Sequence, residues 1–214
     1  MMNMGPYIEW SDYLLKGALV TIQIALASIA IGTIAGFLVG LLRFVPSPSV
    51  RSTVAWTVEI IRAVPLLLML FFIFFALPVI GFDIPIGLSA TLAMSLWMTV
   101  NTAEVVRGGI QSISAGQKEA GMATGLSGVQ IMRYVILPQA VRRILPSYIG
   151  LCTMLTKDTS LAAIIGAFEL TRATQEAIAR TYNSLGFYLI AAFIYFCLCY
   201  PMSAFSRYLE KRFR

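Results

Sequence analysis

Long stretches without a charged residue dominate the pattern of hydrophobic and polar positions along the chain. Four of them are residues 17–42, 63–82, 84–103 and 181–206, which are 26, 20, 20 and 26 residues long. A fifth, residues 144–168, is interrupted only by Lys157 and Asp158. A helix needs about 20 apolar residues to cross a bilayer, and backbone polar groups there must bond within the segment. The pattern therefore predicts an all-α integral membrane protein with five transmembrane helices.

The composition indicates the same class. Hydrophobic residues make up 58% of the 214 residues and charged residues 12%, whereas soluble domains have about 45–50% and about 25%. A soluble domain is excluded, and so is a disordered chain, which needs the opposite balance. The chain has no histidine, the commonest general base and metal ligand. Its three cysteines, Cys152, Cys197 and Cys199, lie in apolar runs and are interpreted as packing residues. We expect no catalytic and no metal site.

Basic residues are unevenly divided between the two sides of the predicted bundle. Twelve follow the stretches 17–42, 84–103 and 181–206: Arg43, Arg51, Arg62, Arg107, Lys118, Arg133, Arg142, Arg143, Arg207, Lys211, Arg212 and Arg214. The opposite side has three, Lys16, Arg172 and Arg180. Because an excess of Lys and Arg marks cytoplasmic loops, we expect the N-terminus outside and the C-terminus in the cytoplasm.

Glycines in the first span recur every four residues, at Gly32, Gly36 and Gly40. A stripe of small residues on one face of a helix lets a second helix approach closely. The stripe predicts packing within the same chain, with a subunit interface as the alternative.

The polar interval at residues 107–143, between the third and fourth spans, contains signals for helix starts and ends. Ser114 and Gln117 form a Ser-x-x-Gln pattern, which favours a helix start because the two side chains satisfy free backbone N–H groups. Gly125 suits a helix end because glycine adopts positive φ without strain.

The Ser-x-x-Gln signal occurs a second time in the interval, at Ser127 and Gln130. Pro138 disfavours continuation of a helix beyond Leu137. The interval therefore predicts a cytoplasmic hairpin of two short helices with a glycine bend. A helix pair resting on lipid headgroups would show the same pattern.

The hairpin also resembles the EAA loop of ABC-importer permeases. That pattern reads Glu-Ala-Ala, three residues, Gly, nine residues, Ile, one residue, Leu-Pro, and this chain keeps the spacing throughout. The matching residues are Glu119, Ala120, Gly121, Gly125, Val135, Leu137 and Pro138, with Gly121 in place of the second Ala and Val135 in place of Ile. Residues 104–110, 117–121, 133–140 and 157–161 resemble the branch of the family that carries polar amino acids such as histidine, glutamate, glutamine and arginine.

The resemblance implies a division of labour between subunits. The loop around Glu119 would be the coupling helix, which docks on a separate ATPase subunit that binds ATP and Mg. A pair of such ATPases would work with two permease subunits, identical or homologous, and with an extracytoplasmic solute-binding protein, in the bacterial plasma (inner) membrane. This chain lacks the Gly-x-x-x-x-Gly-Lys-Ser/Thr phosphate loop. We therefore expect residues 1–214 to form a single transmembrane domain, a non-catalytic permease subunit without a cofactor of its own.

Lys157 and Asp158 are candidates for substrate binding, together with Thr156, Thr159 and Ser160 around them. An ion at the bilayer centre costs about 2.5–3.5 kcal/mol on insertion scales, so charges there are functional by default. Adjacent helical positions point about 100° apart, so the two ions should face different partners, or the helix is locally opened as in broken-helix solute sites. Structural ion pairs with neighbouring helices are the alternative.

Two further positions are expected near the solute path. Asn101 lies at the inner end of the third span, and Pro65 belongs to a segment that lines the path in proteins with the EAA loop. Glu59 and Arg62, placed at the start of the second helix, are expected to pair because they lie three residues apart.

Two other functions remain open at this point. An ion-gradient-driven secondary amino-acid transporter could use Lys157 and Asp158 as an ion relay. A membrane scaffold could use the cytoplasmic hairpin as a docking element.

Overall fold

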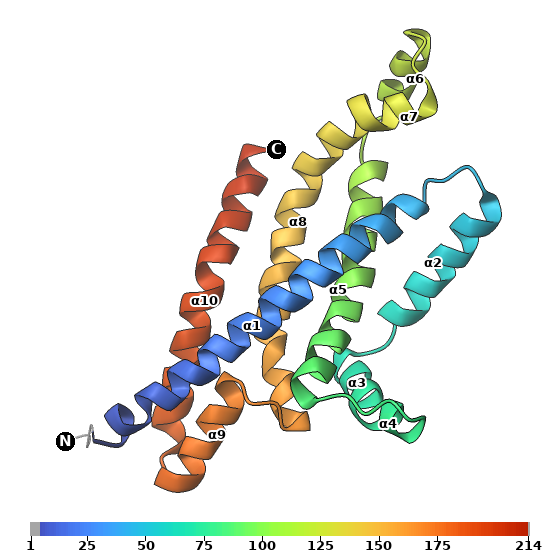
Figure 1. The fold of residues 1–214 in the computed structure, drawn as a ribbon. Helices are drawn as coiled ribbons and strands as arrows, with labels where there is room; N and C mark the ends of the chain where they lie inside the picture. The colour runs from blue at the N-terminus through green and yellow to red at the C-terminus, as the bar shows by residue number, and fades with distance from the viewer. Residues whose placement is uncertain (1–4, 214) are drawn as a thin grey trace.

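The computed structural model describes residues 5–213, and every regular element in that range is helical. The long helices are α1 (Gly5–Leu42), α5 (Ile86–Gln111), α8 (Leu137–Asp158) and α10 (Ser184–Arg212). Helices α8 and α10 run side by side, while α1 crosses α5 obliquely (Figure 1). The predicted all-α architecture is confirmed for the described residues.

The glycine stripe of α1 packs against α5 of the same chain. A Cβ atom on Gly32 would lie 2.5 Å from Cβ of Met98, and one on Gly36 would lie 2.5 Å from the carbonyl oxygen of Thr99. A Cβ atom on Gly40 would lie 2.8 Å from that of Val106. The backbones of the two helices are therefore too close for any side chain at these positions. Packing within the chain is the role of the stripe.

Helix α5 forms the centre of the bundle, with Met94 and Met98 fully buried. Three of its polar side chains bond to carbonyl oxygens one turn earlier: Ser95 and Thr99 through hydroxyls at 2.7 Å, and Asn101 through its amide at 2.8 Å. These bonds remove most of the cost of placing polar groups in an apolar interior. The buried hydroxyl of Thr102 has no hydrogen-bond partner in the described chain.

Two segments, Tyr7–Leu42 and Ser184–Arg212, are long and apolar enough to cross a membrane. The number rises to four if each of two bent helix pairs is one span. Helix α5 covers the predicted span 84–103 but carries more polar side chains than those segments. The membrane class is confirmed, whereas the count of five spans stays a prediction.

The first bent pair turns by 95° around Pro65. It joins α2 (Pro48–Arg62) to a helix made of α3 (Leu66–Phe71), the π-helical η1 (Phe72–Ala76) and α4 (Leu77–Val79). Proline has no N–H group and restricts the residue before it, so α2 ends and α3 begins there. The predicted second span thus begins at Leu66, and placing Glu59 and Arg62 at its start was wrong, because both belong to the last turn of α2.

The second bent pair contains the predicted fourth span. One helix runs from Gly128 to Ile165 through α7 (Gly128–Gln130), the π-helical η2 (Ile131–Ile136), α8 and the 3-10 helix η3 (Thr159–Ile165). After Gly166, where φ is +86°, the chain bends by 51° into α9 (Leu170–Thr181). Helix α9 was not predicted, because its polar residues interrupt the charge-free pattern.

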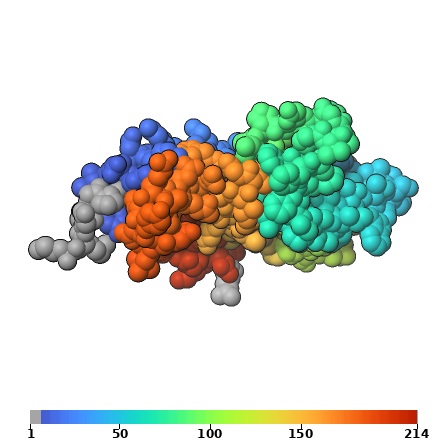
Figure 2. Space-filling view, turned by 90° about the horizontal axis from the view of Figure 1, so that it is seen from below, coloured from blue at the N-terminus to red at the C-terminus, as the bar shows by residue number. Residues whose placement is uncertain are grey.

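Different elements lie at the two ends of the helical bundle. The C-terminal end of α10 lies toward the same end of the bundle as α6 and α7, whereas the start of α1 lies at the other end with α9, α3 and α4 (Figure 1). Viewed from that second end, residues around η3 lie between α9 and the segment from α3 to the start of α5 (Figure 2). The hairpin and α9 therefore mark opposite ends of the molecule.

Candidate functional site

The hairpin begins with α6 (Ala115–Ala123), which Ser114 caps only in part. The Ser114 hydroxyl accepts from the N–H of Gly116 at 3.3 Å. Gln117 does not bond back to the cap; its side-chain oxygen accepts instead from the amide of Gln139, at 3.0 Å. The predicted helix start is confirmed, but its reciprocal bond is replaced by a link from α6 to α8.

Gly125 ends the first hairpin helix, as the sequence predicts. Its φ is +78°, and the N–H of Leu126 donates to the carbonyl of Gly121 at 3.1 Å while that of Gly125 donates to Met122 at 3.0 Å. These two bonds form the Schellman motif, which satisfies the last carbonyls of a helix. Gly121 also lies against Ile131, where a Cβ atom would come within 2.9 Å of the isoleucine. Glycine in place of the second alanine thus accommodates Ile131.

The second hairpin helix has the complete predicted cap but does not end where predicted. The Ser127 hydroxyl accepts from the N–H of Gln130, and the Gln130 side chain accepts from the N–H of Ser127 at 2.8 Å. Ending this helix at Leu137 was wrong, because the chain continues past Pro138 into α8. The π-helical η2 directly before it widens the helix, and such segments accommodate a residue that cannot donate to the preceding turn.

The hairpin projects from the bundle (Figure 1). Apolar side chains on it are exposed. Glu119 and Ala120 are exposed, Met122 is 53% exposed and Val129 is 79% exposed. Leu137 is half-buried and Pro138 exposed at the base. A polar element that presents an acidic residue beside apolar ones has the character of a protein-binding surface.

The predicted solute segment lies at a change of helix type rather than in an unwound stretch. Helix α8 ends at Asp158 and the 3-10 helix η3 begins at Thr159. Thr156 and Thr159 are buried, and each hydroxyl donates to a backbone carbonyl at 2.8 Å. Ser160 is half-buried. The threonine hydroxyls therefore serve the helix itself.

Lys157 and Asp158 point to different surroundings, as their adjacent positions predict. Lys157 lines a groove of about 310 Å³ between α8 and α10, together with Thr153, Ser203 and Arg207. Asp158 is half-buried and does not line that groove. Neither residue forms a salt bridge within residues 5–213.

The other two predicted solute residues come from different elements. Asn101 is half-buried on α5 with its amide bonded to Trp97, and Pro65 is exposed at the start of α3. The structure places neither of them in the groove that Lys157 lines.

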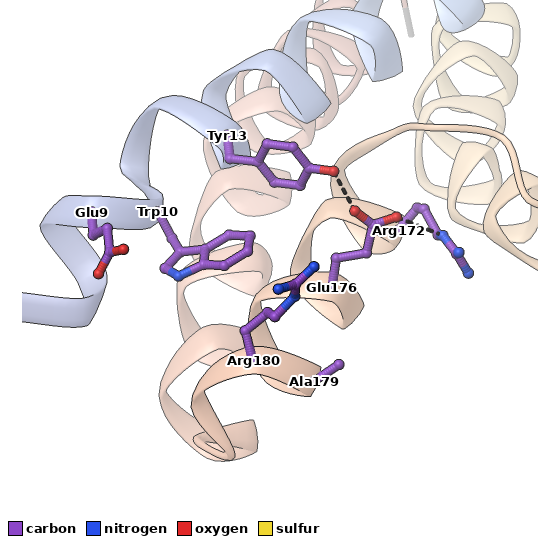
Figure 3. Close-up of a pocket in the computed structure, with 7 residues that line it drawn as sticks. All are labelled: Glu9, Trp10, Tyr13, Arg172, Glu176, Ala179 and Arg180. Carbon is purple, nitrogen blue, oxygen red and sulfur yellow. Dashed lines mark hydrogen bonds and ion pairs between the residues drawn. The ribbon is translucent and has the colours of Figure 1, made fainter.

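A pocket of about 500 Å³ at the opposite end from the hairpin was not predicted (Figure 3). Its lining residues are Glu9, Trp10, Tyr13, Arg172, Glu176, Ala179 and Arg180, from α1 and α9. Arg172 pairs with Glu176 at 3.0 Å, and the Tyr13 hydroxyl donates to the same carboxylate. The spacing of Arg172 and Glu176, four residues apart, was the available signal for a helix here.

Comparison with known proteins identifies the family. Residues 20–214 match the family described as binding-protein-dependent transport system inner membrane component. The chain belongs to this family. It is 37% identical to a probable glutamine ABC transporter permease protein of Bacillus subtilis over 207 residues, 95% of each chain, and 36% identical to the glutamine transport system permease protein of Escherichia coli K12, covering 94% and 93%. A crystal structure of an amino acid ABC transporter with histidines matches with a TM-score of 0.92, at 27% identity and 99% coverage of both chains.

Membership of this family decides between the functions that the sequence left open. The chain is an integral membrane permease subunit of an ATP-driven importer, and not an ion-gradient-driven secondary transporter. Its role is transport, and the resemblance of the hairpin to the EAA loop is explained by the family.

Proposed function

We propose that this permease imports a polar amino acid that a solute-binding protein delivers from outside the bacterial inner membrane. Relatives that align along nearly the whole chain are described as glutamine permeases, and the closely superimposable structure is described as an amino acid transporter. ATP and Mg bind to a pair of partner ATPase subunits. A second permease subunit, identical or homologous, completes the path.

The observation that carries this proposal is the exposed hairpin. Glu119, Ala120 and Met122 lie on a capped helix beyond the end of the bundle, without a partner in the described chain. The bend of the hairpin depends on Gly121 and Gly125, and its base is formed by Leu137 and Pro138. This element is the docking surface for the ATPase.

The proposed topology has five spans within a single domain of residues 1–214. The spans are α1, the α3–α4 helix, α5, the α8–η3 helix and α10. An odd number of spans places the chain ends on opposite sides, in agreement with the positions of the start of α1 and the end of α10 (Figure 1). The excess of basic residues around the hairpin then assigns that end of the molecule to the cytoplasm. Arg214, one of the twelve basic residues counted for this side, lies outside the described residues.

For the solute path we propose contact with Lys157, Asp158 and Ser160. Thr156 and Thr159 shape the helix at this point, because their hydroxyls already bond to the backbone. Asn101 and Pro65 line the path farther along it, from α5 and from the bend before α3.

The test is reconstitution of the permease with its ATPase in vesicles. Loaded solute-binding protein should stimulate ATP hydrolysis and drive uptake of a radiolabelled polar amino acid. Empty binding protein should stimulate hydrolysis less. Equal hydrolysis with and without the loaded binding protein, and no uptake from a panel of amino acids, would contradict the proposed function.

A further inference from the structure

Glu104 of α5 joins three helices through three arginines. Its carboxylate accepts from Arg43, which follows α1, at 3.0 Å from Nη1 to Oε2. Arg62, the last residue of α2, lies 3.7 Å from the same oxygen. Arg107, one turn along α5, donates to both oxygens, with Nε at 2.9 Å from Oε2.

This cluster is partly shielded from solvent. The side chains of Arg43 and Glu104 are 13% and 20% exposed. A bidentate arginine–carboxylate pair within a network of charges holds its geometry better than an isolated surface pair.

Hydrogen bonds connect the cluster to the base of the hairpin. Arg107 donates to the side chain of Gln111, the last residue of α5. The next residue, Ser112, accepts through its carbonyl from Arg143 of α8. Helix α6 begins three residues later, at Ala115. A line of bonded groups therefore runs from the root of the hairpin to Glu104.

The arginines on the far side of Glu104 belong to the elements that lead into the second proposed span. Arg62 ends α2 immediately before the 95° bend that precedes Leu66, and Glu59 approaches Arg62 at 3.8 Å. Arg43 lies in the turn that leads from α1 to α2. Glu104 therefore links α5 both to the end of α1 and to the residue before the bend.

We propose that Glu104 is a positioning residue for the coupling of ATP hydrolysis to import. It clamps the hairpin-side ends of α1, α2 and α5 into one unit, so that force applied to the hairpin moves the bend before the second span. Without the clamp, the ATPase docks and hydrolyses ATP while these helix ends move independently. The inference rests on the proposed function and assigns the step that links the hairpin to the spans.

The test measures ATP hydrolysed per solute imported in proteoliposomes at matched amounts of assembled complex. Glu104→Gln should raise this ratio roughly threefold or more, because residues along a coupling network change its strength without contacting either ligand. Glu210→Gln is the matched control: it makes the same change at the same end of the molecule, on a residue without a salt bridge among residues 5–213. Its ratio should equal that of the unaltered protein.

Two further variants test the role of the cluster if Glu104→Gln does not assemble. Arg43→Gln and Arg62→Gln each remove one arm of the clamp and leave the pair of Glu104 with Arg107 in place. Each should raise the ratio, and the double variant Arg43→Gln with Arg62→Gln should show less than the sum of the two effects if the cluster acts as a unit.

The outcomes separate this inference from the proposed function. The inference alone is overturned if the unaltered complex couples hydrolysis tightly to import and the assembled Arg43→Gln and Arg62→Gln variants hydrolyse the same amount of ATP per solute imported. An unaltered complex with neither stimulated hydrolysis nor uptake would overturn the proposed function.

Discussion

Tyr195 of α10 donates a hydrogen bond to Glu169, with 2.8 Å between its Oη and Oε2 of the carboxylate. Glu169 is 0% exposed and caps α9 by accepting from the N–H of Arg172 at 2.8 Å. Thr21 of α1 donates to the same carboxylate at 3.4 Å. One buried acidic residue therefore joins α1, α9 and α10 at the end opposite the hairpin.

Tyr195→Phe should lower the free energy of unfolding by about 1–3 kcal/mol, because it removes a hydrogen bond to a fully buried carboxyl group. The measurement is thermal or denaturant unfolding of the purified protein in detergent. Tyr188→Phe, on an exposed tyrosine of the same helix, is the control and should change stability little. Equal effects of the two variants would mean that the Tyr195 bond contributes no stability.

Gly36→Ala should destabilise the packing of α1 on α5 by about 1–3 kcal/mol, the usual cost of overpacking. The added Cβ would lie 2.5 Å from the carbonyl of Thr99, a backbone atom that cannot rotate away. Gly87→Ala is the matched control, because a Cβ there meets nothing within 4 Å. Unfolding in detergent measures both. A Gly36→Ala protein as stable as the control would contradict the close helix contact.

Glu119→Arg should abolish association with the ATPase while leaving membrane insertion intact. The change reverses the charge at the centre of the exposed helix α6, for which we propose the docking role, and leaves the caps of that helix unaltered. Co-purification of the ATPase with the tagged permease measures the effect. Asp83→Arg reverses an exposed acidic charge in the loop at the opposite end and should leave co-purification unchanged. Normal uptake by the Glu119→Arg variant would contradict the docking role.

Asp158→Ala should abolish solute uptake while the complex with the ATPase still assembles. The half-buried carboxylate has no salt bridge within the described chain, so its removal leaves no buried cation unpaired there. Thr156→Val is the control. It removes only a hydroxyl that donates to the carbonyl of Cys152, one turn earlier in α8, and should retain uptake. Unchanged uptake kinetics for Asp158→Ala would remove this residue from the path.

The sequence predicted best what depends on local patterns. Charge-free stretches located the long helices, and Ser127, Gln130 and Gly125 predicted the caps and bend of the hairpin from chemistry that acts over a few residues. The spacing of Gly32 and Gly36 predicted close packing, although only the structure identifies α5 as the partner.

The remaining features depend on contacts between distant segments. Pro138 appeared to end a helix because the π-helical segment before it has no sequence signal. The cap of α9, Glu169, likewise bonds to Thr21 and Tyr195, which are far away in the sequence and leave no local pattern. The solute residues have the same limit, because the surroundings of Asp158 depend on how neighbouring helices pack and not on the residues beside it.

The central claim, that the hairpin receives the ATPase, is tested most directly by a photo-activated cross-linker placed at residue 119 in the assembled complex in membranes. The predicted result is an adduct with the ATPase subunit, together with no such adduct from the same cross-linker at residue 83. Cross-linking of residue 119 to lipid alone, in a complex that contains the ATPase, would contradict the account.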